Sequence, residues 1–382
     1  MFSVLSKRGR TQVAAVALTA TAIASSLFAA PAGASGHWTF TEVRSRSSST
    51  PNSSYVGVTT STAGSTWAIG YEAHQLNGRM TDQPLVAHWN GSGWSHIPAP
   101  PNPPHSQSGS DPRDVSVVGT SSVWVLASYT VGGTDNTYVA HWKNGKWGVK
   151  LLGTAIITRM AAFSDGDVWL LGTAGFSGPA RAWHLTSGGH LSSAPLPAQP
   201  NGFPQPGAAS TGWVTAFSPA TREPALLHYN GHAWVAAPAP AVSHAPTTSV
   251  YYEGVARRSP SDVWLTVGYG ANEGMAPGIG LWHWDGVRWT HKLERPNDGP
   301  MGLALGTGQG VWISAGGTTP TGTLLHYVGS GSTATTVALP SRNGLTLQVE
   351  GLAKVANRSA LLAAGELVRN GAASGAIAEF IS

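Results

Sequence analysis

One short pattern recurs along this chain at a period of roughly 45 to 55 residues. A Trp follows a small or acidic pair, a variable segment comes next, and then His, an aromatic residue, a Gly-containing turn and a second Trp. The clearest copy is Ser261-Asp262-Val263-Trp264 followed by His283-Trp284-Asp285-Gly286-Val287-Arg288-Trp289. Repeats of this length are typical of propellers, in which each repeat is a small sheet that needs neighbours to bury its faces. The pattern therefore predicts an all-β ring of blades.

The number of repeats sets the number of blades. The first Trp recurs as Trp67, Trp124, Trp169, Trp213, Trp264 and Trp312, and the His recurs as His88, His141, His184, His228, His283 and His326. A weaker seventh copy follows, with residues 361–365 in the place of the Trp strand and Ala378-Glu379-Phe380 in the place of the His strand. It lacks a last strand, and the alternating segment His37–Val43 has the character of that strand. We predict a seven-bladed β-propeller whose last blade is closed by the N-terminal strand.

Glycines mark two places in each predicted blade. The innermost strand is expected at residues 55–58 in the first blade and 253–256 in the fifth. Small residues at its centre suit a crowded channel where the strands converge, and these are Gly57, Gly254, Gly302 and Gly351. Turns between the last two strands need positive φ, which is supplied by Asn90-Gly91, Asn144-Gly145, Asn230-Gly231 and Asp285-Gly286.

The first 34 residues have the features of an export signal. Basic residues at Lys7, Arg8 and Arg10 precede an uncharged apolar run over 13–30, and Ala32-Gly33-Ala34 offers a cleavage site. An uncleaved membrane anchor is the alternative, since the run is nearly long enough to span a bilayer. The small residues favour cleavage. We expect a signal peptide over 1–34, a single propeller domain over 35–382, no membrane span after cleavage, and a secreted or cell-wall-associated protein.

Charge and cysteine content exclude several classes of function. The formal charge is +4, and the signal peptide carries three basic residues and no acid, so the mature chain has a charge of +1. No basic stripe remains for nucleic acid, and no nucleic-acid partner is expected. The chain contains no Cys, so stability must come from the core and from closure of the ring. We expect a monomer without a cofactor.

The aligned histidines look like metal ligands, but their positions favour a structural role. Each belongs to a different blade, so they cannot share one metal ion, and no metal is expected. We predict that each His hydrogen-bonds a group at the first turn of its own blade, such as Asp167 for His184 or Asp262 for His283. This is similar to the structural His–Asp arrangement of WD40 propellers.

The repeat resembles that of a known group of proteins. Ser261-Asp262-Val263-Trp264 and the His283 to Trp289 segment are similar to repeats of secreted Kelch-like or WD-like propellers, especially those of actinomycetes. The resemblance covers the mature chain and implies the fold and secretion. Most members of that group have no assigned activity, so it implies no particular reaction.

A ligand is expected at the mouth of the channel, at the end formed by the loops after the second and fourth strands. Tyrosines and charged residues gather at the strand ends on this side. Aromatic rings beside carboxylates and Arg suit recognition of sugars or peptides, through stacking and charge-assisted hydrogen bonds. The candidate ligand-binding residues are Tyr55, Tyr71, Arg113, Asp114, Tyr129, Arg159, Tyr252, Glu253, Tyr269 and Glu350.

Two functions fit this mouth. The first is non-catalytic binding of an extracellular glycan or protein partner. The second is a hydrolase or lyase acting on polysaccharide, which needs two carboxylates at a suitable separation or a Tyr base beside Arg, such as Tyr252 with Arg113 or Arg159. The motifs of familiar enzymes, including G-x-S-x-G, H-E-x-x-H and the P-loop, are absent from the sequence. The sequence therefore favours binding and identifies no catalytic residue.

Overall fold

A computed structural model describes most of the chain after residue 35. The described residues are 36–44, 52–61, 64–76, 79–90, 92–107, 110–164, 166–175, 178–197, 209–210, 212–217, 224–242, 249–270, 278–296, 298–306, 310–317, 322–329, 332–355, 359–369 and 372–381. By its contacts the chain divides into Met1–Ala32 and Gly33–Ser382. The predicted signal peptide lies outside the described residues. Among the residues described there is no helix long and apolar enough to cross a membrane.

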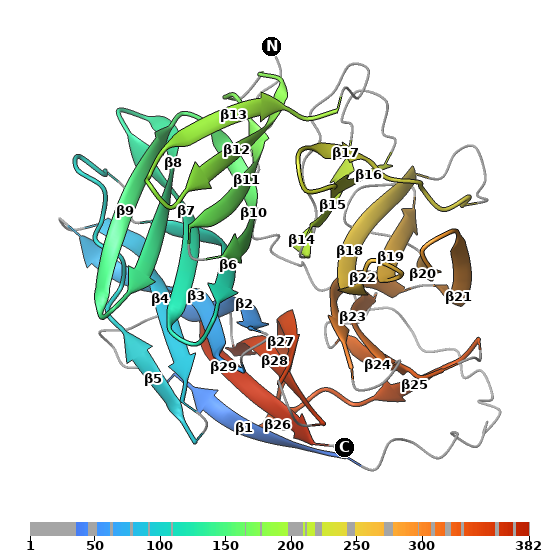
Figure 1. Ribbon diagram of the computed structural model, residues 1–382. Coiled ribbons are helices and arrows are strands. Elements are labelled where there is room, and N and C mark those ends of the chain that lie inside the picture. Colours follow the sequence, from blue (N-terminus) through green and yellow to red (C-terminus); the bar gives the residue numbers. More distant parts are fainter. Residues whose placement is uncertain are drawn as a thin grey trace. The chain divides into compact units, whose positions relative to one another are not determined.

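The second unit consists of seven antiparallel sheets (Figure 1). Blades 1 to 3 contain β2 (Ser53–Thr60), β3 (Thr66–Leu76), β4 (Arg79–Trp89) and β5 (Trp94–Ile97); β6 (Asp111–Val118), β7 (Ser122–Val131), β8 (Thr134–Lys143) and β9 (Lys146–Gly153); and β10 (Ile156–Ser164), β11 (Asp167–Thr173), β12 (Ala180–Thr186) and β13 (Leu191–Pro195). Blades 4 to 6 contain β14 (Ala209–Ser210), β15 (Trp213–Phe217), β16 (Pro224–Tyr229) and β17 (Trp234–Ala236); β18 (Ser249–Ser259), β19 (Asp262–Gly270), β20 (Gly278–Trp284) and β21 (Trp289–Pro296); and β22 (Asp298–Leu305), β23 (Val311–Gly317), β24 (Thr323–Tyr327) and β25 (Ala334–Val337). Blade 7 contains β26 (Ser341–Arg342), β27 (Leu345–Lys354), β28 (Ala360–Arg369), β29 (Ala372–Ile381) and β1 (His37–Val43).

The first long strand of each sheet lies at the centre of the ring. β2, β6, β10, β14, β18, β22 and β27 each contact the corresponding strand of the next sheet, and β27 contacts β2 to close the circle. Figure 1 shows these strands gathered around the middle, with the later strands of each blade farther out. The predicted seven-bladed β-propeller is confirmed.

The N-terminal strand completes blade 7, as the repeat count predicts. β1 pairs with β29 in antiparallel register, with Trp38 opposite Phe380. The indole N–H of Trp38 donates to the carbonyl of Ala338 at 2.9 Å, and the Arg44 backbone N–H donates to the carbonyl of Gly375 at 2.8 Å. These contacts join the two ends of the ring within a single sheet.

The closing strand also contacts the neighbouring blade 1. The indole N–H of Trp94 donates to the hydroxyl of Thr41 at 3.0 Å. His96 Nε2 lies 3.1 Å from a carboxylate oxygen of Glu42, and Arg44 forms a salt bridge with Glu72. β1 therefore holds the last blade to the first through side chains as well as through the sheet.

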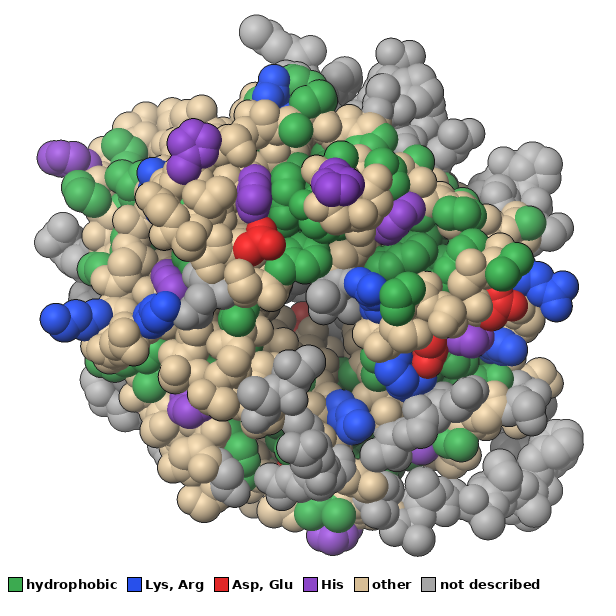
Figure 2. Space-filling view, in the orientation of Figure 1, with side chains coloured by type: hydrophobic (Ala, Val, Ile, Leu, Met, Phe, Trp, Pro, Cys, Tyr) green, Lys and Arg blue, Asp and Glu red, His purple; other side chains and the backbone are tan. Residues whose placement is uncertain are grey.

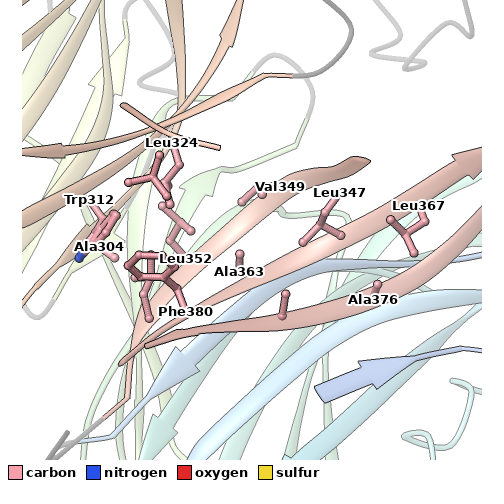
Figure 3. Packing of buried hydrophobic residues seen from close by; sticks show 13 residues of the cluster. Ala304, Trp312, Leu324, Leu347, Val349, Leu352, Ala363, Leu367, Ala376 and Phe380 are labelled. Atoms are coloured by element: carbon pink, nitrogen blue, oxygen red, sulfur yellow. The ribbon is translucent and has the colours of Figure 1, made fainter. Parts of the chain in front are cut away.

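Apolar clusters fill the spaces between blades. Figure 3 shows the cluster between blades 6 and 7, where Trp312 and Phe380 lie next to each other with their ring planes at 68°. Their ring centroids are 5.3 Å apart, and Leu352 packs in the same cluster. Each blade packs both of its faces against neighbouring blades, so the central part of each face is shielded from solvent.

The repeated His packs against the repeated Trp of its own blade, stacked in five blades and tilted by 31° in blade 5. The ring centroids are separated by 4.3 Å for Trp67–His88, 3.7 Å for Trp124–His141, 4.3 Å for Trp169–His184, 5.4 Å for Trp213–His228, 4.4 Å for Trp264–His283 and 3.8 Å for Trp312–His326. His184 Nε2 lies 2.6 Å from Asp167 Oδ1, and His283 Nε2 lies 3.1 Å from Asp262 Oδ1. The predicted partners are confirmed in these two blades.

We expect replacement of His283 by Ala to destabilise the fold without touching the channel. Asp262 would lose one of its partners, and the stacked face of Trp264 would lose its cover. The expected loss is about 1–3 kcal/mol of unfolding free energy, the scale of one hydrogen bond to a charged group. Urea unfolding of the variant measures this loss. A variant of normal stability that had lost ligand binding would contradict the structural role.

Candidate functional site

The inner strand carries an extra residue at one register in six of the blades. In blade 1 the register shifts between Tyr55 and Gly57, and in blade 5 it shifts between Tyr252 and Gly254. The bulged residues are Val56, Arg113, Thr158, Glu253, Met301 and Glu350. The blade 4 counterpart lies outside the described residues. Bulges redirect side chains and are frequent beside functional sites. Here they form a ring of positions at one level of the channel.

The inner strands approach each other closely next to the bulges. A Cβ placed on Gly254 would lie 2.9 Å from the Cβ of Leu303 in the next blade, and a Cβ on Gly351 would lie 2.9 Å from the Cα of Gly57. Glycine at these positions therefore permits the close packing, as the sequence predicts. In blades 2 and 3 the same position holds Asp114 and Arg159 instead. These two blades consequently bring charged groups to the inner strands.

Asp114 links blade 2 to blade 3. One carboxylate oxygen accepts a hydrogen bond from the backbone N–H of Val115 at 2.9 Å, and the other accepts from the backbone N–H of Met160 at 2.8 Å. Burial raises the pKa of Asp114, although Arg159 and these two hydrogen bonds act in the opposite direction. The carboxylate is therefore already engaged by the protein, which makes Asp114 a positioning group rather than a free acid.

Two arginines lie near Asp114 at this end of the channel. Arg159 is half-buried and donates from Nη1 to the carbonyl of Thr158 at 2.7 Å. The Arg113 side chain is 47% exposed, lies 3.0 Å from Asp111, and donates to the hydroxyl of Ser128 at 3.1 Å and 3.2 Å. A guanidinium has five N–H donors, so both arginines keep donors for a ligand.

The two candidate glutamates lie on other blades. Glu253 is exposed on β18 of blade 5, and Glu350 is half-buried on β27 of blade 7. Blade 6 separates them, so the two carboxylates belong to inner strands that are not neighbours. The sequence-predicted charged residues therefore share one level of the channel but are distributed around it.

The tyrosines are placed differently from the charged residues. Tyr55, Tyr129 and Tyr252 are buried, with exposures of 0%, 6% and 7%. Their rings join the clusters between blades, and burial raises the pKa of Tyr252 to about 12. Tyr71 and Tyr269 are half-buried, and the Tyr269 hydroxyl is enclosed. Aromatic surface for stacking at this mouth is therefore limited to parts of Tyr71 and Tyr269 among the predicted residues.

The position of the bulge is marked in the sequence by a fixed distance from the repeated Trp. Gly57, Asp114, Arg159, Gly254 and Gly302 each stand ten residues before the first Trp of their blade. The residue one place earlier is the bulged one, which adds Val56, Thr158 and Met301 to the predicted set. A fixed distance from a repeated Trp is readable from sequence, whereas the bulge itself is not.

Among the described residues the charged side chains do not gather into a metal site, and those on the face in Figure 2 do not form a single-sign patch. The described residues contain no group of three or more His, Asp or Glu side chains placed to hold a metal ion. On the face seen in Figure 2, basic, acidic and His side chains are interspersed, and the middle of the ring is hollowed. The arrangement is suited to recognising a ligand with several polar groups.

Fold and site together define a β-propeller with a charged channel mouth, and solved structures share this fold. YCF48 bound to D1 peptide has a TM-score of 0.55 at 13% identity, covering 92% of this chain and 99% of that one. A catalytically inactive virginiamycin B lyase from Staphylococcus aureus, with quinupristin, gives 0.57 at 13% identity, covering 91% and 100%. A PL25 ulvan lyase gives 0.53 at 9% identity, covering 86% and 95%. No protein-family model and no curated protein sequence matches this chain.

Proposed function

We propose that this protein is an exported, non-catalytic binding propeller that recognises an extracellular protein partner at the bulged end of its channel. The observation that carries the proposal is the ring of inner-strand bulges, which brings Arg113, Glu253 and Glu350 to one level. The features of an export signal over 1–34 and the resemblance of the repeats to those of secreted propellers support export. The protein acts as a monomer.

The composition of the mouth favours a polypeptide over a glycan. Sugar recognition depends on open aromatic faces, and three of the five candidate tyrosines are buried between blades. Exposed groups of both signs remain, with Arg113 on blade 2 and Glu253 on blade 5. Charge-assisted hydrogen bonds from such groups suit a peptide carrying both carboxylate and ammonium side chains. The D1 peptide bound to a propeller of the same fold is consistent with this use.

The same geometry supports binding over catalysis. A polysaccharide hydrolase needs two carboxylates facing one bond, and Glu253 and Glu350 lie on blades that are separated by a third. A lyase needs an accessible base, whereas Tyr252 is 7% exposed and burial raises its pKa to about 12. Arg113 and Arg159 lie on blades 2 and 3, away from Tyr252 on blade 5.

The experiment is a binding measurement on the mature chain with a defined peptide library and a glycan array. For the tightest ligand found, we expect Arg113→Ala or Glu253→Ala to weaken binding by about 10- to 100-fold, which corresponds to about 1–3 kcal/mol for a lost charged hydrogen bond. Unfolding free energy should change little, because the Arg113 and Glu253 side chains are exposed.

Arg288→Ala and Lys146→Ala are the matched controls. Both residues lie at the turns between third and fourth strands, at the opposite end of their blades from the bulges. The Arg288 side chain is 80% exposed. Loss of binding in these variants, with normal binding by the Arg113 and Glu253 variants, would show that the other face is functional. Tight binding to glycans alone would overturn the choice of a protein partner.

A further inference from the structure

The position two residues before the repeated Trp is a hydrogen-bonding position in four blades. It is occupied by Ser65, Ser122, Asp167 and Asp262 in blades 1, 2, 3 and 5. In each of these blades its oxygen lies within 3.1 Å of the Nε2 atom of the repeated His. The side chain at this position is therefore the polar partner of the stacked His.

Blade 5 shows how an anionic oxygen is held there. Asp262 Oδ1 accepts from the indole N–H of Trp264 at 2.7 Å and lies 3.1 Å from His283 Nε2. Partial burial opposes ionisation, yet hydrogen bonds from Arg258, His283 and Trp264 hold the pKa of Asp262 below its usual value. The space beside the packed Trp264 and His283 rings thus accommodates a carboxylate oxygen, and this carboxylate is also paired with Arg258.

In blade 6 this position is Gly310, and a cavity lies beside the rings. Trp312 and His326 are stacked at 3.8 Å with an angle of 3° between their planes, and both line a cavity of about 20 Å³. Gly310 has no side chain to offer, and its carbonyl accepts from the backbone N–H of Gly306 at 2.7 Å and from Arg258 Nη2 at 3.2 Å. A cavity of this size holds one water molecule or one ion of similar size.

The lining of the cavity carries donors and a positive charge. An ideal Cβ on Gly306 would lie 3.1 Å from Trp312 Nε1, which puts the indole N–H at the cavity wall. Lys354 of blade 7 also lines the space, and none of the described lining residues carries a carboxylate. Burial lowers the pKa of His326, so its ring is neutral near pH 7 and has one N–H to donate. The lining therefore supplies two ring donors, the Lys354 side chain and the Ser359 hydroxyl, and its described residues carry no carboxylate.

We propose that this cavity between blades 6 and 7 binds a small monovalent anion of halide size, which replaces the carboxylate oxygen that Asp262 supplies in blade 5. The anion accepts from Trp312 and His326 and is paired with Lys354 across the boundary between the blades. An anion that binds the folded chain and not the unfolded chain raises the free energy of unfolding, and well above its dissociation constant this rise follows the logarithm of the anion concentration. The site is independent of the channel mouth.

The first test compares thermal unfolding of the mature chain in sodium chloride and in sodium gluconate, whose anion is too large for the cavity. At equal ionic strength up to about 0.5 M, we expect the Tm of the parent in chloride to be about 3 °C higher than its Tm in gluconate.

The Gly310→Asp variant should have the same Tm in both salts, equal to that of the parent in chloride, because the protein then supplies its own carboxylate. The Lys354→Met variant should also have the same Tm in both salts, equal to that of the parent in gluconate.

The second test locates the ion directly. Crystals soaked in sodium bromide should show an anomalous peak between Trp312 and His326 in the parent chain, and Gly310→Asp should remove that peak but leave any others. Equal Tm values in the two salts together with no peak would overturn the proposal. A chloride effect of the same size in Lys354→Met and Gly310→Asp would also overturn it, since the effect would then arise elsewhere on the protein.

Discussion

Deletion of the N-terminal strand His37–Val43 should cause the largest loss of stability of any change considered for this protein. The deletion removes the backbone pairing with β29 and the packing of Trp38 on Phe380, whose centroids are 5.1 Å apart. It also removes the hydrogen bond from Trp94 to Thr41. The apolar strand β29 then becomes an unpaired edge, a condition that promotes aggregation. We expect Tm to fall by at least about 10 °C and soluble yield to fall with it.

The control is the mature chain from residue 35, which keeps the strand. Trp38→Ala offers a graded version, because it removes the hydrogen bond to Ala338 and the ring contact while leaving the backbone pairing. Differential scanning calorimetry with a solubility assay measures all three proteins. A deletion variant that melts within a degree or two of the control would refute closure of the ring by this strand.

Replacement of Gly351 by Val should produce the second largest effect. A Cβ at this position would lie 2.9 Å from Gly57 Cα and 3.0 Å from the Val58 backbone nitrogen, so the backbone of blade 1 must move away from blade 7. Overpacking of a tight interior commonly costs 1–3 kcal/mol. We expect a loss of about 3 kcal/mol or more here, because the atoms that must move are backbone and the boundary is the one at which the ring closes.

Gly57→Ala is the matched control for this prediction. Its added Cβ would lie 3.6 Å from Ile69 and 3.7 Å from Val115, which are ordinary contact distances. We expect this variant to unfold within about 1 kcal/mol of the parent in urea. Equal stability of the Gly351 and Gly57 variants would show that the inner strands do not approach as closely as the structure has them.

The blades could be predicted because their markers are repeated core residues. Trp264 and His283 pair in one sheet, and their counterparts occupy equivalent positions in other sheets, so the spacing of these residues gives the number and order of strands. The closing strand could be predicted because the seventh repeat lacked one strand and His37–Val43 supplied it. Both conclusions depend on counting repeats, which needs no knowledge of side-chain position.

The candidate site was less accessible to sequence reasoning. Tyr129 and Tyr252 stand near strand ends, where the alternation of residues predicts partial exposure, yet both are buried. In a propeller both faces of a blade pack against neighbours, so alternation cannot separate a solvent-facing side from an interblade side. The sequence predicts that Asp114 contacts a ligand. In the structure its carboxylate accepts a hydrogen bond from the Met160 backbone N–H, and this bond depends on the distance between two neighbouring inner strands. That distance follows from the packing of the whole ring.

The pairing of the two chain ends in one sheet has a consequence for the order of events during biogenesis. Thr41 donates from its hydroxyl to the carbonyl of Ile377, a partner 336 positions away. During synthesis from the amino end, β1 is made first and its partner β29 is made last. The blades in between can form as they are made, but β1 stays unpaired until β29 is complete. The whole chain must therefore be delivered before the circle exists, and any truncated product leaves this strand exposed to chaperones and proteases.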